Sequence, residues 1–231
     1  FLGKRFFEWS LILPLSIPPY ILAYTFTGLF DSYGTLNNLI RDIFDLNQSF
    51  VFFPNVRNIY GAIIVFSFTL YPYIYLVSRS AFLNQSRSIL ESGRILGLNR
   101  FEISFKLAMP MIRPAVIGGL ILVIMETLSD FGAVEHFAIP TFTTGIFRTW
   151  FGMGDLITAM QLSSFLLLFI CMFLFIENKT RKNAEYVSDS STHVPIKVEK
   201  LSLGYSILAF IFCSIPLLIG FVLPVSELTI W

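Results

Sequence analysis

Five apolar stretches, each about as long as a helix that crosses a bilayer, recur along this chain between polar segments. A membrane-spanning helix needs about 20 mostly apolar residues, and such stretches occupy residues 10–30, 58–77, 111–128, 156–176 and 201–223. The composition agrees, because 55% of the 231 residues are hydrophobic and only 13% are charged, whereas a soluble domain is about 25% charged. We therefore expect an all-α, polytopic transmembrane helix bundle in a lipid bilayer.

Prolines interrupt two of these stretches. The first stretch contains Pro14, Pro18 and Pro19, so it should be kinked or begin irregularly, and the second contains Pro72. Breaks of this kind are tolerated in a membrane where neighbouring helices satisfy the freed carbonyls, which favours a packed bundle over isolated anchors. The pair Gly118-Gly119 in the third stretch either permits a close helix approach or makes no special contact.

The basic residues fix an orientation. If the loops alternate across five spans, all but three of the 16 lysines and arginines fall on one side, and the three on the other side are Arg41, Arg57 and Arg148. Basic loops face the cytoplasm, so residues 80–110 should lie in the cytosol. The net charge of +1 indicates no nucleic-acid partner.

The polar segment 178–200 predicts a division of the chain. We expect residues 1–177 to form part of a first bundle with about four spans, residues 178–200 to form a cytoplasmic linker, and residues 201–231 to form the first span of a second bundle. The chain opens with Phe1 and ends directly after an apolar stretch, so we interpret it as part of a longer protein.

The cytoplasmic segment 86–110 predicts two short helices joined at a glycine. Apolar or small residues at 89, 90, 93, 96 and 97 share one helix face. Gly97 can end that helix in a left-handed conformation, and Asn99 with Glu102 resembles a capping box for a second helix over about 100–109. Pro110 would then begin the next span. From the residues alone, the segment either rests on lipid headgroups or docks onto a cytosolic partner.

The spacing within this segment resembles the EAA loop of ABC-importer permeases, which reads Glu-Ala-Ala, three residues, Gly, nine residues, then Ile-x-Leu-Pro. Here Glu91, Gly97 and Pro110 match, Leu107 and Met109 are conservative replacements, and the small residues Ser92 and Gly93 stand where the family has alanines. The resemblance implies that the loop docks into a groove on a separate ATP-binding subunit, which acts as a dimer.

That resemblance also implies roles for single residues. Glu91 would make a polar contact or cap, Gly97 would permit the turn, and Phe101 would be an apolar anchor. The chain has no GxxxxGK[ST] phosphate loop, so we expect a transport subunit that is not itself an enzyme. It would bind no cofactor, and ATP would be held by the partner subunit.

Three further segments, 9–24, 61–86 and 125–155, resemble iron(III)-transport permeases. The resemblance implies a multi-pass protein of the bacterial inner membrane that takes ferric iron from a periplasmic binding protein. Permeases for sulfate, thiamine, polyamines or phosphonates are the near alternatives.

Four polar residues, Glu126, Asp130, Glu135 and His136, follow the outer end of the third stretch. Carboxylate oxygens suit a hard cation, so these residues are candidates for a substrate path, although no metal site is assigned. The alternative is that they cap helix ends or form structural ion pairs, for instance with Arg148. Less favoured functions are an integral-membrane enzyme that uses Glu126, Asp130 and His136 as acid and base, and a membrane-anchored assembly protein.

Overall fold

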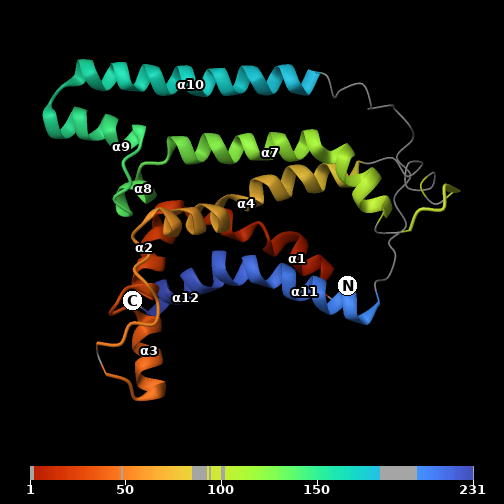
Figure 1. The fold of residues 1–231 in the computed structure, drawn as a ribbon, viewed down its shortest axis with the longest axis horizontal. Coiled ribbons are helices and arrows are strands. Elements are labelled where there is room, and N and C mark those ends of the chain that lie inside the picture. Colours follow the sequence, from red (N-terminus) through yellow and green to blue (C-terminus); the bar gives the residue numbers. More distant parts are fainter. Residues whose placement is uncertain are drawn as a thin grey trace. The chain divides into compact units, whose positions relative to one another are not determined.

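A computed structural model describes residues 3–47, 49–84, 93, 95–99, 102–182 and 202–230, with side chains described up to residue 175 and again from 202 (Figure 1). No strand occurs in these ranges. The elements, in order, are α1 (Lys4–Ser10), η1 (Leu13–Ser16), α2 (Pro19–Phe30), α3 (Thr35–Phe44), α4 (Ile59–Leu83), η2 (Ile103–Ala108), α7 (Met109–Ser129), α8 (Gly132–His136), α9 (Phe142–Phe147), η3 (Arg148–Gly152), α10 (Leu156–Lys182), α11 (Leu203–Leu217), η5 (Leu218–Val222) and α12 (Leu223–Ile230). The segment η1 is a 3₁₀-helix, whereas η2, η3 and η5 are π-helical.

In the part of the chain that the structure describes, four helices are long and apolar enough to cross a membrane, which confirms the expected all-α membrane bundle. They span Ile59–Leu83, Ile103–Ser129, Leu156–Phe175 and Leu203–Ile230. A fifth candidate is a broken one, in which Lys4–Ser16 and Pro19–Phe44 meet at 90°. The break falls where Pro14 lies in η1 and Pro19 begins α2, as the proline pattern predicted.

The chain divides into two compact units. The first comprises Phe1–Pro72, Thr127–Leu166 and Leu201–Trp231, and the second comprises Tyr73–Glu126 and Leu167–Lys200. Thus α4, α7 and α10 each contribute to both units. The boundary in α4 falls directly after Pro72, which the helix accommodates without ending.

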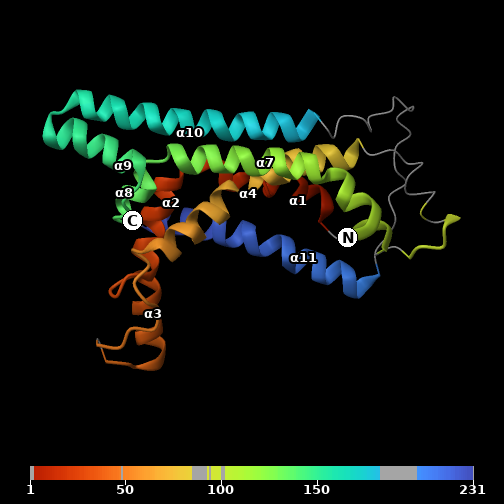
Figure 2. The same ribbon diagram turned by 45° about the horizontal axis from the view of Figure 1, so that its top comes forward.

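The first unit is built around α2. This helix contacts α3, α8 and α12, and its Leu22 and Ala23 are fully buried. The α11 segment lies beside α1, where the rings of Phe7 and Phe210 meet edge to face at 5.2 Å (Figure 1, Figure 2). Residues 202–230 therefore pack against the start of the chain, and their assignment to a second bundle stays a prediction.

In the second unit, α4 and α7 approach closely at Gly119. A Cβ atom at this position would lie 2.7 Å from the Cα of Ile74. A Cβ on the neighbouring Gly118 would meet nothing within 4 Å. The predicted close approach of helices is therefore confirmed for Gly119 and does not involve Gly118.

Pro110 lies in the first turn of α7, as predicted, but the expected break before it is absent. Helical structure continues from Ile103 to Ser129, so the second loop helix and the span form one continuous helix. The reason is the π-helical turn η2, in which the Met109 N–H donates to the Ser104 carbonyl five residues back. A local shift of this kind is one way in which a helix accommodates proline, which has no N–H of its own.

Candidate functional site

The glycine turn in the 86–110 loop is built as predicted. Gly97 has φ +74°, which is the left-handed region, and the Leu98 N–H donates to the Gly93 carbonyl at 3.1 Å. This six-to-one hydrogen bond after a left-handed residue is the Schellman arrangement that ends helices. A Cβ at Gly97 would meet nothing within 4 Å, so glycine is favoured here by its backbone conformation and not by lack of space.

The second helix starts with the predicted capping box. The Glu102 N–H donates to Asn99 Oδ1 at 2.9 Å, and the Asn99 N–H donates to Glu102 Oε2 at 3.0 Å. Lys106 Nζ also lies 2.8 Å from Glu102 Oε1, one turn further along. The hydrogen bond from Lys106, then that from the Asn99 backbone, and the charge of Lys106 lower the pKa of Glu102. The carboxylate therefore stays ionised and holds the helix start.

Gly93 links the two helical pieces. It is buried, and a Cβ there would lie 2.8 Å from Leu107 Cδ1 and 3.0 Å from Ile103 Cγ1. The side chains of Ile95, Leu96 and Phe105, in contrast, are exposed. Of the predicted coupling residues, Gly93, Gly97, Leu107 and Pro110 are therefore placed, whereas Glu91, Ser92 and Phe101 lie outside the described residues.

The described part of this loop is suited to binding another protein. It combines exposed apolar side chains with a turn fixed by local hydrogen bonds, and pre-organisation of this kind lowers the entropic cost of association.

Among the predicted outer residues, Asp130 caps a helix. Its Oδ1 accepts hydrogen bonds from the Ala133 N–H at 2.9 Å and the Val134 N–H at 3.2 Å. Burial raises the pKa of Asp130, and the two backbone hydrogen bonds oppose that rise. The Asp130 carbonyl further accepts from Thr143 Oγ1 at 2.7 Å. These contacts fit the structural alternative, since they order α8 and α9.

His136 makes a hydrogen bond to the membrane helix α2. Its Nε2 lies 2.8 Å from Thr27 Oγ1, and that hydroxyl donates its single proton to the Ala23 carbonyl. Nε2 must therefore carry the proton and donate to Thr27. Burial, and secondly the charge of Arg57, lower the pKa of His136, which keeps the ring neutral.

Glu126 and Glu135 are exposed. Within the described ranges, no group of three or more His, Cys, Asp or Glu side chains could hold a metal ion. The first unit does contain a cavity of about 370 Å³, but only apolar residues line it, among them Phe26, Phe68 and Phe137. An ion would find no side-chain ligand there.

Sequence reasoning missed one buried carboxylate. Glu227 in α12 is 1% exposed, and its Oε1 accepts a hydrogen bond from Thr35 Oγ1 at 2.6 Å. The sequence does show an acidic residue next to an apolar stretch. A charged side chain is costly in a membrane, so such a residue suggests a specific partner or role. The predicted stretch ends at residue 223, whereas the helix continues to Ile230, so Glu227 falls outside the prediction.

Comparison with known proteins identifies the class. Residues 1–182 match the family described as "Binding-protein-dependent transport system inner membrane component". A Fe(3+)-transport system permease protein of Haemophilus influenzae is 28% identical over 100% of this chain and 41% of its own length. A molybdenum transport system permease protein of Escherichia coli K12 is 25% identical over 59% of the chain and 57% of its own length. A sulfate transport system permease protein of Salmonella typhimurium is 23% identical over 60% of the chain and 47% of its own length.

The chain thus spans less than two thirds of these curated relatives. No solved structure matches it significantly.

Proposed function

As this chain belongs to the family of binding-protein-dependent transport system inner membrane components, we propose that it forms part of the permease of an ATP-driven importer of ferric iron. Membership makes it an inner-membrane transport component and not an enzyme. In the proposed cycle, a periplasmic binding protein delivers the substrate, and a separate ATPase dimer drives the change between inward-open and outward-open states.

The observation that carries the coupling proposal is the turn at Gly97. It holds Ile95 and Leu96 exposed on one side and starts a capped helix on the other. In our proposal these side chains and Phe101 enter a groove on the ATPase, since apolar and aromatic anchors in pockets supply most of the energy of typical interfaces. Glu91 and Ser92 would complete the contact.

Ferric iron is supported by the extent of the resemblance. The iron relative matches the whole chain, whereas the molybdenum and sulfate relatives match 59% and 60% of it. Glu126, Asp130, Glu135 and His136 stay predicted contributors to the substrate path. Of these, the exposed Glu126 and Glu135 are the better candidates, because Asp130 and His136 already have structural hydrogen bonds.

The coupling proposal is tested by replacing Gly97 in the full-length protein. Valine is disfavoured at positive φ, at a cost of about 1–2 kcal/mol, whereas asparagine tolerates this conformation. We expect Gly97→Val to reduce both co-purification of the ATPase and uptake, and Gly97→Asn to retain most of each. Normal association and uptake in Gly97→Val would refute the docking role.

The substrate is tested separately with the partner binding protein. We expect this protein to stimulate ATP hydrolysis by the reconstituted transporter when it is loaded with ferric iron. Stimulation by molybdate or sulfate in place of iron would overturn the specificity and leave the coupling mechanism intact.

A further inference from the structure

One segment of the first unit buries polar side chains and exposes apolar ones. It consists of α3 and the returning residues 45–53, which we name the α3 hairpin (Figure 1). Asn37 and Arg41, one turn apart on α3, are buried at 1% and 6% exposure. The large apolar side chains Ile43 and Phe44 are instead 66% and 67% exposed. A helix on a water-soluble domain shows the opposite pattern, with its apolar face inward.

Asn37 is fully hydrogen-bonded to the backbone inside the hairpin. Asn37 Nδ2 donates to the carbonyls of Phe30 and Asp31. Its Oδ1 accepts from the backbone N–H groups of Phe52 and Phe53, both at 3.1 Å. The amide therefore uses both donors and both acceptor sites, and it ties the returning chain to α3.

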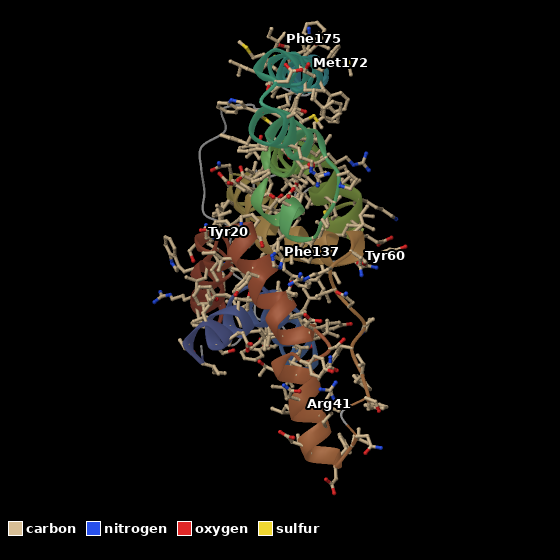
Figure 3. The ribbon with its side chains drawn as sticks, turned by 90° about the vertical axis from the view of Figure 1, so that its left-hand side faces the viewer. Tyr20, Arg41, Tyr60, Phe137, Met172 and Phe175 are labelled. Carbon is tan, nitrogen blue, oxygen red and sulfur yellow. The ribbon has the colours of Figure 1, made fainter. Side chains whose placement is uncertain are left out.

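Arg41, labelled in Figure 3, is held in the same way. Its Nε donates to the Phe50 carbonyl at 2.8 Å, one NH₂ group donates to Asn38 Oδ1 at 2.9 Å, and the other donates to the Ser32 carbonyl. The guanidinium carbon lies 5.6 Å from the centre of the Tyr33 ring. Carbonyl dipoles and an aromatic face thus replace the water that a surface arginine would bind.

Large apolar side chains are exposed on both arms of the hairpin. Leu39, Ile43 and Phe44 are exposed on α3, and Phe50, Val51 and Phe52 are exposed on the returning arm. The chain then leads into the candidate membrane helix α4, whose first residues Ile59 and Tyr60 are also exposed. Asp42, within α3, and Asp45, directly after it, are also exposed, so the hairpin cannot lie wholly in hydrocarbon, where a charge is costly.

We propose that the α3 hairpin is seated at the surface of the outer leaflet of the membrane, where lipid acyl chains cover Leu39, Ile43, Phe44 and Phe52 and the carboxylates of Asp42 and Asp45 reach the headgroups and water. The choice of leaflet follows from the predicted orientation, whereas the lipid contact depends on neither the substrate nor the coupling mechanism.

Lipid acyl chains fit this surface better than a transiently bound protein partner does. Non-obligate protein interfaces are only about as apolar as the rest of a protein surface, at roughly 56–58%. Here the large exposed side chains of the hairpin are almost all aliphatic or aromatic, the two buried polar side chains Asn37 and Arg41 face inward, and the hairpin leads into a candidate membrane span.

The experiment uses the full-length protein with every native cysteine, Cys171 and Cys213 among them, replaced by serine, reconstituted in phosphatidylethanolamine and phosphatidylglycerol vesicles. Single cysteines at Ile43, Phe44 or Asp42 carry a nitroxide spin label, and collision rates with oxygen and with a water-soluble nickel chelate are measured. Ile207, exposed in the candidate span α11, provides the lipid reference, and Asp42 provides the aqueous one. Each measurement is repeated with the binding protein added.

We expect labels at Ile43 and Phe44 to favour oxygen over nickel several-fold, as at Ile207, whether or not the binding protein is present. Nickel access at Ile43 and Phe44 equal to that at Asp42 would overturn the proposal. Shielding that appears only with the binding protein would identify a protein-docking surface instead. Exclusion of both reagents would show that another part of the protein covers the hairpin, which also overturns it.

Discussion

Two adjacent glycines in α7 provide a controlled test of how closely helices pack in the second unit. Gly119 lies against the backbone of Ile74, and Gly118 faces open space. Replacing either glycine by alanine adds one methyl group to the same helix, with the same gain in helix propensity of about 1 kcal/mol. The two variants therefore differ mainly in what the methyl group meets.

The size of the effect follows from the contact. A Cβ at residue 119 would lie 2.7 Å from Ile74 Cα, and ordinary contact begins at 3.4 Å, so α4 and α7 must separate by about 0.7 Å. Overpacking of this kind costs about 1–3 kcal/mol. Because the propensity gain cancels between the variants, we expect Gly119→Ala to be less stable than Gly118→Ala by about 1–3 kcal/mol.

The assay is thermal unfolding of the full-length protein in detergent, with the two single variants and wild type compared side by side. We expect Gly118→Ala to unfold at or above the wild-type midpoint and Gly119→Ala to unfold below that of Gly118→Ala. Adding Ile74→Ala should not rescue Gly119→Ala, because the nearest atom is backbone. Equal midpoints for the two glycine variants, or full rescue by Ile74→Ala, would refute the close approach.

Three other predictions concern single hydrogen bonds. Asn99→Ala removes the capping acceptor, which costs about 1 kcal/mol. The rate of amide hydrogen exchange at the start of the second loop helix should therefore rise several-fold, whereas Asn99→Ser should leave this rate near that of the wild type. His136 has a lowered pKa in the folded state, so it contributes stability above a pH of about 6.5 that is lost as the pH falls. His136→Gln keeps a donor for Thr27, so the midpoint of thermal unfolding should vary less with pH between about pH 5 and 7 than in the wild type. The same pH dependence in the variant and the wild type would contradict this. Glu227→Leu leaves the Thr35 hydroxyl without its acceptor and should cost about 1–3 kcal/mol; Glu227→Gln should cost less, and a double-mutant cycle with Thr35→Val should show coupling between the two side chains.

Features encoded by a few neighbouring residues were predictable from the sequence. The left-handed turn needs Gly97, the capping box needs Asn99 and Glu102, and the broken first span needs Pro14 and Pro19. In each case the structure depends on hydrogen bonds or sterics within about five residues, so no knowledge of distant packing was required.

Features set by distant parts of the chain were not predictable in the same way. The Thr35–Glu227 hydrogen bond joins residues 192 positions apart, and no local sequence pattern predicts it. The inward-facing Asn37 and Arg41 were missed because an apolar face is ordinarily assigned to the core. Asn37 and Arg41 can be buried because the returning residues 50–53 supply backbone hydrogen-bond partners, and the local sequence of α3 does not show this. The continuous helix at Pro110 was missed because proline is a common first helical residue, and only the π-helical turn before it shows the alternative.

The buried position of Gly93 explains the departure of this loop from the sequence it resembles. The EAA pattern has alanine here, and an alanine methyl would lie 2.8 Å from Leu107 Cδ1. Glycine at this position leaves the side chains of Ile103 and Leu107 undisturbed, and the Schellman hydrogen bond from Leu98 ends on the carbonyl of the same residue. Gly93 therefore joins the turn to the packing of the second helix. If the ATPase dimer acts through this loop, as we propose, the contact between Gly93 and Ile103 would pass movement of the turn to the continuous helix that ends at Ser129.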